Sequence, residues 1–195
     1  MGNELSQGSQ EYKHFTQEQI RELTNKTKFN AKQIKALEAK YYAIKDSLLS
    51  SKFTIDEFIA GMEITNRGVG EIMFKIIDTD GNHEIDPDEF ILGLDIFLPD
   101  TPQDIKIQKF FNAYDTDNNR TISKTEVFEI VELSLENTSF KMTRAQIKST
   151  VNDLFRIFGP KGAQELNYEQ FHTMAKSVPS IVDLIKYDVF ELMKS

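Results

Sequence analysis

The chain has 195 residues, of which 39% are hydrophobic and fifteen are phenylalanine, so there is enough apolar material for one large domain or two small ones. Its formal net charge of −8 argues against nucleic-acid binding and suits a protein that concentrates cations. Cysteine is absent, which excludes disulfides and thiol catalysis. No run of eighteen apolar residues and no hydrophobic N-terminal signal segment occurs, so we expect a soluble, cytoplasmic protein.

The first residues, MGNELS, match the N-myristoylation pattern, in which Gly2 receives the acyl chain. One myristoyl chain holds a protein at a membrane only marginally, so stable attachment needs a second attraction. Residues 21–45 supply a candidate, because their basic side chains outnumber Glu22 and Glu38 and could face anionic lipid. An ordinary solvated helix face is the alternative. The basic residues are Arg21, Lys26, Lys28, Lys32, Lys35, Lys40 and Lys45.

A twelve-residue pattern then recurs four times along the chain. In each copy an aromatic residue lies four positions before the segment, an apolar residue follows it, and the eighth position is hydrophobic. The eighth-position residues would pair the first copy with the second, and the third with the fourth, through a short β-bridge. We call the copies the first to fourth loops; they span residues 46–57, 78–89, 115–126 and 159–170, with Phe53, Ile85, Ile122 and Leu166 at the eighth positions.

The first loop (DSLLSSKFTIDE) has the wrong residues for binding a cation, since Leu48 stands at its third position. The fourth loop (GPKGAQELNYEQ) has Gly159, Lys161 and Ala163 where carboxylates would be needed, and it ends in Gln170. We predict that both are silent and serve to complete the two pairs. Ordinary helix–loop–helix segments are the alternative.

The second loop, DTDGNHEIDPDE, carries oxygen donors at its first, third, fifth, seventh, ninth and twelfth positions. Ca²⁺ takes six to eight oxygens at about 2.3–2.6 Å, and a short loop supplies them when alternate residues point inward and a final glutamate gives two. The spacing predicts an EF-hand calcium loop. Its predicted ligands are Asp78, Asp80, Asn82, the Glu84 carbonyl, Asp86 and bidentate Glu89.

The third loop, DTDNNRTISKTE, repeats the spacing. Acidic surface turns are the alternative for these two loops, but the same spacing twice with matching flanks disfavours them. We therefore expect two Ca²⁺ per chain, and tighter binding in the second loop, which offers four carboxylates where the third offers three. The predicted ligands of the third loop are Asp115, Asp117, Asn119, the Thr121 carbonyl, Ser123 and Glu126.

The sixth position of such a loop usually holds glycine, because the backbone turns sharply there. Here it holds His83 in the second loop and Arg120 in the third. A side chain in a left-handed conformation costs about 1–2 kcal/mol, and histidine tolerates it better than most residues. Both loops should therefore bind, but more weakly than their glycine versions, and Gly81 is expected to share part of the bend.

Helix starts follow from capping residues. Thr54 with Glu57, and Ser123 with Glu126, form capping boxes. Asp86–Pro87 and Thr101–Pro102 each place a capping oxygen before a proline at the first helical position.

These elements predict an all-α fold with two paired EF-hand lobes and a C-terminal helix. The stretch 98–102 (LPDTP) is the expected hinge between the lobes, and residues 181–194 have apolar residues at helical spacing. The predicted parts are an N-terminal segment 1–29, an N-terminal EF-hand pair 30–98, a C-terminal pair 99–178 and a C-terminal helix 179–195.

With these features the chain resembles the neuronal calcium sensor (recoverin-like) family and its calcineurin B-like relatives. The resemblance rests on the N-terminal start, the Thr27-Lys28-Phe29 segment, the silent first loop, the two binding loops, the stretch 119–131 (NRTISKTEVFEIV) and the helix after the fourth loop. The Cys-Pro pair of the family's first loop and both sixth-position glycines are absent, and calcineurin B-type subunits usually keep four working loops. The resemblance implies a sensor that offers an apolar surface to a target helix.

The favoured function is a calcium sensor in signalling, in which Ca²⁺ swings the helices apart and exposes a groove for an amphipathic helix of a kinase, phosphatase or membrane protein. A constitutive calcineurin B-like subunit of an enzyme and a calcium buffer are the alternatives. We predict that the chain is not itself an enzyme, because His14, His83 and His172 lie far apart in sequence and no nucleophile motif occurs. The candidate groove residues are Phe29, Ile34, Leu37, Tyr41, Phe58, Met62, Phe74 and Phe90, most of which are equally suited to a core, the commoner place for such residues.

Overall fold

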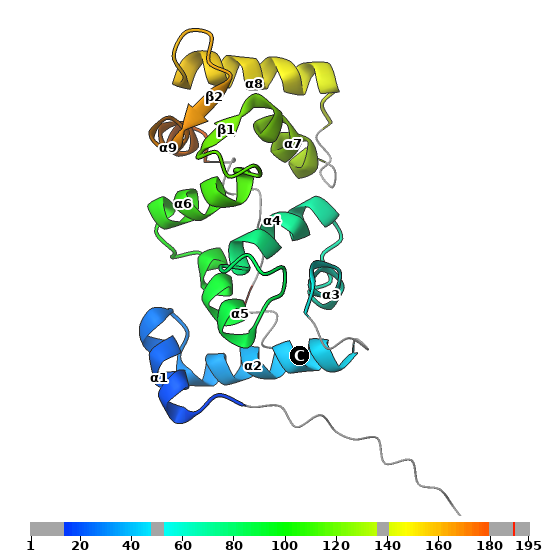
Figure 1. Ribbon diagram of the computed structural model, residues 1–195, viewed down its shortest axis with the longest axis vertical. Coiled ribbons are helices and arrows are strands. Elements are labelled where there is room, and N and C mark those ends of the chain that lie inside the picture. The colour runs from blue at the N-terminus through cyan, green and yellow to red at the C-terminus, as the bar shows by residue number, and fades with distance from the viewer. Residues whose placement is uncertain (1–13, 48–52, 136–140, 180–188, 190–195) are drawn as a thin grey trace, which may run out of the picture.

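The computed structural model describes residues 14–47, 53–135, 141–179 and 189 (Figure 1). The first half contains helices α1 (Gln17–Lys26), α2 (Ala31–Ser47), α3 (Ile55–Gly61), α4 (Arg67–Ile77) and α5 (Pro87–Leu94), followed by the 3₁₀ turn η1 (Asp95–Phe97). The second half contains α6 (Gln103–Tyr114), strand β1 (Thr121–Ser123), α7 (Lys124–Leu135), α8 (Arg144–Phe158), strand β2 (Glu165–Asn167) and α9 (Tyr168–Ser177).

The predicted all-α class is confirmed, since the only strands in the described residues are β1 and β2. Figure 1 shows the two halves stacked along the long axis, with α1 and α2 at one end and α8 at the other. Helix α4 joins them, because it contacts both α6 and α7. The predicted C-terminal helix lies outside the described residues apart from Val189, which is buried, and Gly2 lies outside them as well.

The predicted loop pairing is present in both halves. In the second half β1 and β2 form an antiparallel ladder in which Ile122 faces Leu166, and neither residue is exposed. In the first half the Ile85 amide donates to the Phe53 carbonyl at 2.9 Å. Each silent loop therefore supports the centre of a predicted calcium loop.

Three of the four predicted helix starts are confirmed. Thr54 and Ser123 form reciprocal capping bonds with the glutamates three residues later, and the Asp86 side chain caps α5, whose first residue is a proline. The prediction for Thr101 is wrong: α6 begins at Gln103, and the Thr101 hydroxyl donates instead to the Asp95 carbonyl at 2.7 Å.

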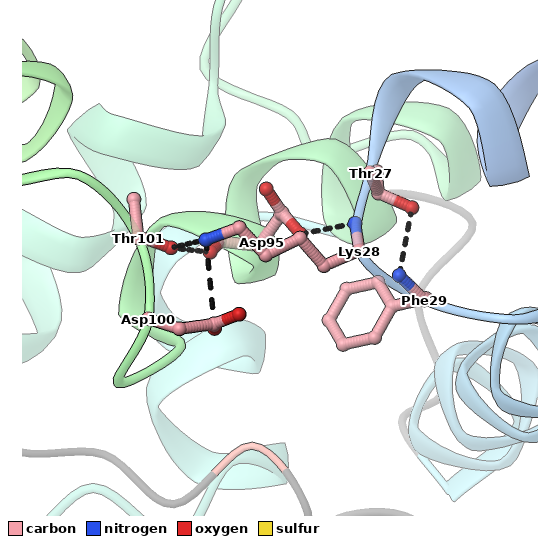
Figure 2. A network of polar contacts seen from close by, with 6 residues as sticks. All are labelled: Thr27, Lys28, Phe29, Asp95, Asp100 and Thr101. Atoms are coloured by element: carbon pink, nitrogen blue, oxygen red, sulfur yellow. Dashed lines mark hydrogen bonds and ion pairs between the residues drawn. The ribbon is translucent and has the colours of Figure 1, made fainter.

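The segment that connects the halves is held by Lys28, which lies in the turn between α1 and α2 (Figure 2). The Lys28 amide donates to Asp95 Oδ1 at 2.8 Å, and the Lys28 ammonium donates to Thr101 Oγ1 at 3.1 Å and lies 3.5 Å from Asp100 Oδ1. Lys28 thus contacts both ends of the segment that connects α5 to α6, residues 95–102. The stretch predicted to be a hinge is therefore anchored to the turn between α1 and α2 in this conformation, and the Thr101 hydroxyl accepts from Lys28 rather than from an amide of α6.

The core of the first half is a cluster of aromatic rings. Tyr41 lies edge-on to Phe53 and Phe90, with centroids 5.0 and 5.6 Å apart, and Phe58 lies edge-on to Phe74 at 5.8 Å. Edge-to-face pairs of this kind stabilise by about 0.5–1.5 kcal/mol each beyond the area they bury. In the second half Phe111 and Tyr114 pack in the same way against Phe171.

The predicted target groove is closed in this structure. The candidate residues belong to the core, and none of them is more than 4% exposed. An exposed groove is thus not a property of this conformation, because the same apolar residues fill the interior of the first half. The residues concerned are Phe29, Ile34, Leu37, Tyr41, Phe58, Met62, Phe74 and Phe90.

Candidate metal centres

The second loop begins where α4 ends, so that Asp78 is both the C-cap of the helix and the first predicted ligand. Its carboxylate accepts hydrogen bonds from the amides of Gly81 and Asn82 through Oδ1, and from the amide of His83 through Oδ2 at 3.0 Å. The Asp80 carboxylate accepts from Asn82, and the Asn82 side chain accepts from the Glu84 amide at 2.7 Å. These hydrogen bonds hold the loop backbone in a curve around the side-chain oxygens of Asp78, Asp80 and Asn82.

Glu89 closes the second loop from the first turn of α5. Its Oε1 accepts the Thr79 amide at 2.9 Å and the Asp80 amide at 3.2 Å, while Oε2 accepts the Asp86 amide. Asp86 in turn caps α5 by accepting the Glu89 amide at 2.8 Å. The glutamate is 6% exposed and is therefore held between the beginning and the end of the loop.

The third loop repeats this arrangement at the end of α6. Asp115 is the C-cap of α6 and accepts the amides of Asn119 and Arg120, each at 2.9 Å. Glu126 accepts the Thr116 amide through Oε1 and the Ser123 amide through Oε2, both at 2.8 Å. The two loops therefore share one hydrogen-bond plan.

The structure brings three of the predicted carboxylates of each loop together in a cluster, whereas Asp86, the fourth predicted carboxylate of the second loop, caps α5 and is not part of its cluster. In each cluster one oxygen from every acid lies within 4.8 Å of the others, and no third cluster of metal-ligating side chains occurs in the described part of the chain. Oxygen-only donors suit a hard divalent cation such as Ca²⁺, and a cation there would offset the repulsion among the acids. The clusters are Asp78, Asp80 and Glu89 in the second loop, and Asp115, Asp117 and Glu126 in the third.

Both loops open onto the same cleft, which has a volume of about 810 Å³. Asp78 and Asp80 line it from the second loop and Asp115 lines it from the third, and Lys75 and Lys109 also line it. A cation can therefore reach both clusters from one side of the molecule.

Burial and hydrogen bonding act in opposite directions on Glu126. Burial disfavours its charged form, but the hydrogen bonds from Ser123 and Thr116 outweigh burial and lower the pKa of the carboxyl group. The side chain is thereby kept ionised, which is the form that binds a metal.

The left-handed backbone predicted at the sixth positions is confirmed. His83 has φ 64° and Arg120 has φ 67°, and both side chains point into exposed surroundings. Gly81 shares the bend, as expected, with φ 72°, and Asn118 occupies the same fourth position of the third loop with φ 57°. Each binding loop thus contains two left-handed residues, and the sixth-position amide donates to the first aspartate.

We expect Arg120→Gly to tighten Ca²⁺ binding in the third loop and His83→Gly to change binding in the second loop little. Glycine relieves about 1–2 kcal/mol of left-handed strain for an ordinary residue, while the added flexibility of the free loop opposes it by several tenths of a kcal/mol. Loss of the positive charge at Arg120 acts in the same direction as the relief of strain, whereas histidine is less strained from the start. Calorimetric titration with Ca²⁺ measures both changes, and weaker binding by Arg120→Gly would contradict the strain argument.

The fourth loop lacks the ligand acids and has no left-handed residue at its sixth position, but it keeps the terminal cap and the fourth-position bend of the other loops. Gln170, at its twelfth position, accepts the Asn167 amide at 3.0 Å, and Asn167 accepts the Gln170 amide at 3.0 Å. Gly162 supplies a left-handed residue with φ 81°. Part of the first loop lies outside the described residues, but its Phe53 and Glu57 are placed.

Two contributors to the binding loops were missed from the sequence. Thr79 and Thr116 occupy the second positions, and each hydroxyl donates to Oε1 of the terminal glutamate, at 3.0 and 2.8 Å. The identical Asp-Thr-Asp start of the two loops was the signal that could have found them. Tyr41, predicted only as a groove residue, contacts the second loop through its hydroxyl.

The remaining predicted features are placed as follows. His172 is partly buried, and its Nε2 lies 2.8 Å from Asp104 Oδ1, which Lys176 also contacts. Hydrogen bonds from Lys176 and His172 hold the pKa of Asp104 below its usual range. The three histidines do not meet, since His14 lies beside Glu38 and His83 is exposed in the second loop.

The basic side chains of residues 21–45 lie on α1 and α2 and in the turn between them, and they are not all available to a partner. Lys28 contacts the connecting segment, Lys26 lies 3.8 Å from Glu22, and the Lys45 ammonium lies over the Tyr41 ring. Arg21, Lys32 and Lys35 are exposed. No helix among the described residues is long and apolar enough to cross a membrane.

Comparison with known proteins finds relatives that cover nearly the whole chain. Calcineurin B type 2 of Mus musculus, which is named as a subunit, is 28% identical over 178 residues, which are 91% of this chain and 89% of the relative. The human protein of the same name is 25% identical, over 91% of this chain and 94% of its own length. A recoverin family protein of Dictyostelium discoideum is 26% identical over 201 residues, which cover 90% of this chain and 88% of the relative. No protein-family model matches the chain.

Proposed function

We propose that this chain, an EF-hand calcium-binding protein related to calcineurin B and to a recoverin family protein, is a sensor that binds two Ca²⁺ ions and then a target helix. The observation that carries the proposal is the pair of oxygen clusters in the second and third loops. The proposed ligands are the side chains of Asp78, Asp80, Asn82, Asp86, Glu89, Asp115, Asp117, Asn119, Ser123 and Glu126, with the carbonyls of Glu84 and Thr121.

The closed first half is the starting state that a sensor requires. Helix α4 ends where the second loop begins, and helix α5 begins within that loop. An ion in this loop therefore acts on the two helices that carry the buried side chains of Phe74 and Phe90. A movement of either helix would uncover apolar side chains that now form the core, which is the change a sensor needs and a buffer lacks. The proposed target is an amphipathic helix of a kinase, phosphatase or membrane protein.

Ca²⁺ binding and membrane attachment are proposed to lie in different parts of the chain. Residues 30–98 form the lobe of the second loop and residues 99–178 the lobe of the third, with the C-terminal helix at 179–195. Myristoylation of Gly2 and the exposed basic residues Arg21, Lys32 and Lys35 would bring a cytoplasmic protein to an anionic membrane surface.

A constitutive subunit is the second candidate, because the calcineurin B relatives are by name subunits. In that case Ca²⁺ would be a permanent structural ion and the partner would stay bound without it.

The test is the fluorescence of an apolar dye with Ca²⁺ and with chelator, combined with capture of partners from native lysate under both conditions. A sensor gives dye binding and capture only with Ca²⁺, whereas a subunit retains its partner in chelator. Ca²⁺ binding with neither change identifies a buffer and contradicts the proposal. A chain carrying both Glu89→Gln and Glu126→Gln is the control, since it should respond to Ca²⁺ in neither assay.

A further inference from the structure

Tyr41, in the middle of α2, reaches across to the centre of the second loop. Its hydroxyl donates to the carbonyl of Ile85, the eighth residue of that loop, at 2.9 Å. Tyr41 is 2% exposed, and its ring is fixed against Phe53 and Phe90. Burial raises the pKa of the phenol, so the hydroxyl keeps the proton that it donates.

The two halves of the molecule hold their loop centres differently. In the second half a ladder of three residue pairs joins the third loop to the fourth through the backbone. In the first half the described residues show one backbone hydrogen bond between the loop centres, from the Ile85 amide to the Phe53 carbonyl. The Ile85 carbonyl therefore accepts its hydrogen bond from the Tyr41 hydroxyl. This donor is a side chain on helix α2, not the backbone of a second strand.

The position of Tyr41 in the repeat is also specific. It lies five residues before the first loop, and the corresponding positions before the other three loops hold Met73, Phe110 and Leu154. None of these side chains has a hydroxyl, so packing alone does not require one at this position. The hydroxyl is found in the half whose described residues contain no strand ladder.

Ile85 lies between two of the proposed ligands, because the Glu84 carbonyl precedes it and the Asp86 side chain follows it. With both polar groups of Ile85 bonded to groups outside the loop, the peptide units on either side of it are restricted in orientation, and these units carry the Glu84 carbonyl and lead into Asp86. A loop that is ordered before the ion arrives loses less conformational entropy on binding.

We propose that Tyr41 is a positioning residue for Ca²⁺ in the second loop, supplied by the silent first EF-hand in place of a strand. The inference rests on the proposed binding of Ca²⁺ by that loop. It gives the first EF-hand a role in ion binding although its own loop cannot bind an ion.

The test uses two backgrounds that separate the sites. The Glu126→Gln chain reports on the second loop alone and the Glu89→Gln chain on the third alone. Tyr41→Phe keeps the ring and removes only the hydroxyl. Phenylalanine is also the natural residue at the corresponding position of the second half, Phe110. Tyr168→Phe, which removes a hydroxyl from a ring packed on Phe111, is the matched control.

We expect Tyr41→Phe to weaken Ca²⁺ binding about three- to tenfold in the Glu126→Gln background, the effect of losing about one buried hydrogen bond, and to leave it unchanged in the Glu89→Gln background. Tyr168→Phe should change neither. Calorimetric titration measures the affinities, and urea unfolding with and without Ca²⁺ tests for a purely structural role. Equal destabilisation in both conditions with unchanged affinity would overturn the inference. If the Glu126→Gln chain with Tyr41 intact binds no Ca²⁺, then the proposed function of the second loop fails, and the inference falls with it.

Discussion

Glu89→Gln and Glu126→Gln are each expected to remove one of two Ca²⁺ ions per chain. The terminal glutamate supplies two oxygens and a full negative charge to its loop, and glutamine supplies neither the second anionic oxygen nor the charge. Replacement of residues that only orient a metal ligand already costs about 10–100-fold in affinity, so loss of the ligand itself should cost more than about 100-fold.

The substitution should leave the helix starts intact, and the fourth loop of the chain supports this. Gln170 stands at the same twelfth position and forms the same reciprocal cap with Asn167 without a charge. Glu89 and Glu126 accept backbone amides in this way, and a glutamine oxygen can accept them too. Loss of the ion can therefore be separated from loss of the fold by circular dichroism.

Calorimetric titration should give two ions for the natural chain, one for each single variant and none for the double variant. We expect Glu89→Gln to remove the tighter step, because the second loop has four carboxylates and the third has three together with Arg120. A third ion in the natural chain, or a Glu89→Gln chain that loses only the weaker step, would contradict the assignment.

Local features of the fold were predictable from the sequence because neighbouring residues determine them. The capping boxes at Thr54 and Ser123 need only a hydroxyl and a glutamate three residues later, and both formed. The left-handed residues His83 and Arg120 follow from the fixed geometry of a twelve-residue loop. Spacing alone was sufficient for these elements.

Features that depend on distant residues were not predictable in the same way. Thr101 has the sequence of a helix cap, but its hydroxyl donates to the Asp95 carbonyl and accepts from Lys28, which is 73 residues away in the chain. The Tyr41 hydroxyl finds its partner 44 residues away, so nothing near it in sequence reveals the bond. The candidate groove residues are a different case, since periodicity shows that Phe58 or Phe90 is apolar but not whether it is exposed in a given conformation.

Ca²⁺ is expected to raise the thermal unfolding temperature of the chain by about 10–20 °C relative to chelator. An ion that binds only the folded state stabilises it by about 2.7 kcal/mol at a free concentration 100 times the dissociation constant, and two independent sites double this. For a chain of 150–250 residues each kcal/mol corresponds to about 2–4 °C. The effect should be large because both clusters hold three acids within 4.8 Å, and these repel one another without a cation.

Circular dichroism melts at saturating Ca²⁺ and in excess chelator measure the shift, with the chain carrying Glu89→Gln and Glu126→Gln as control. That chain should melt at the same temperature in both solutions. If Ca²⁺ raised the unfolding temperature of the double variant as much as that of the natural chain, the stabilising ions would lie outside the second and third loops.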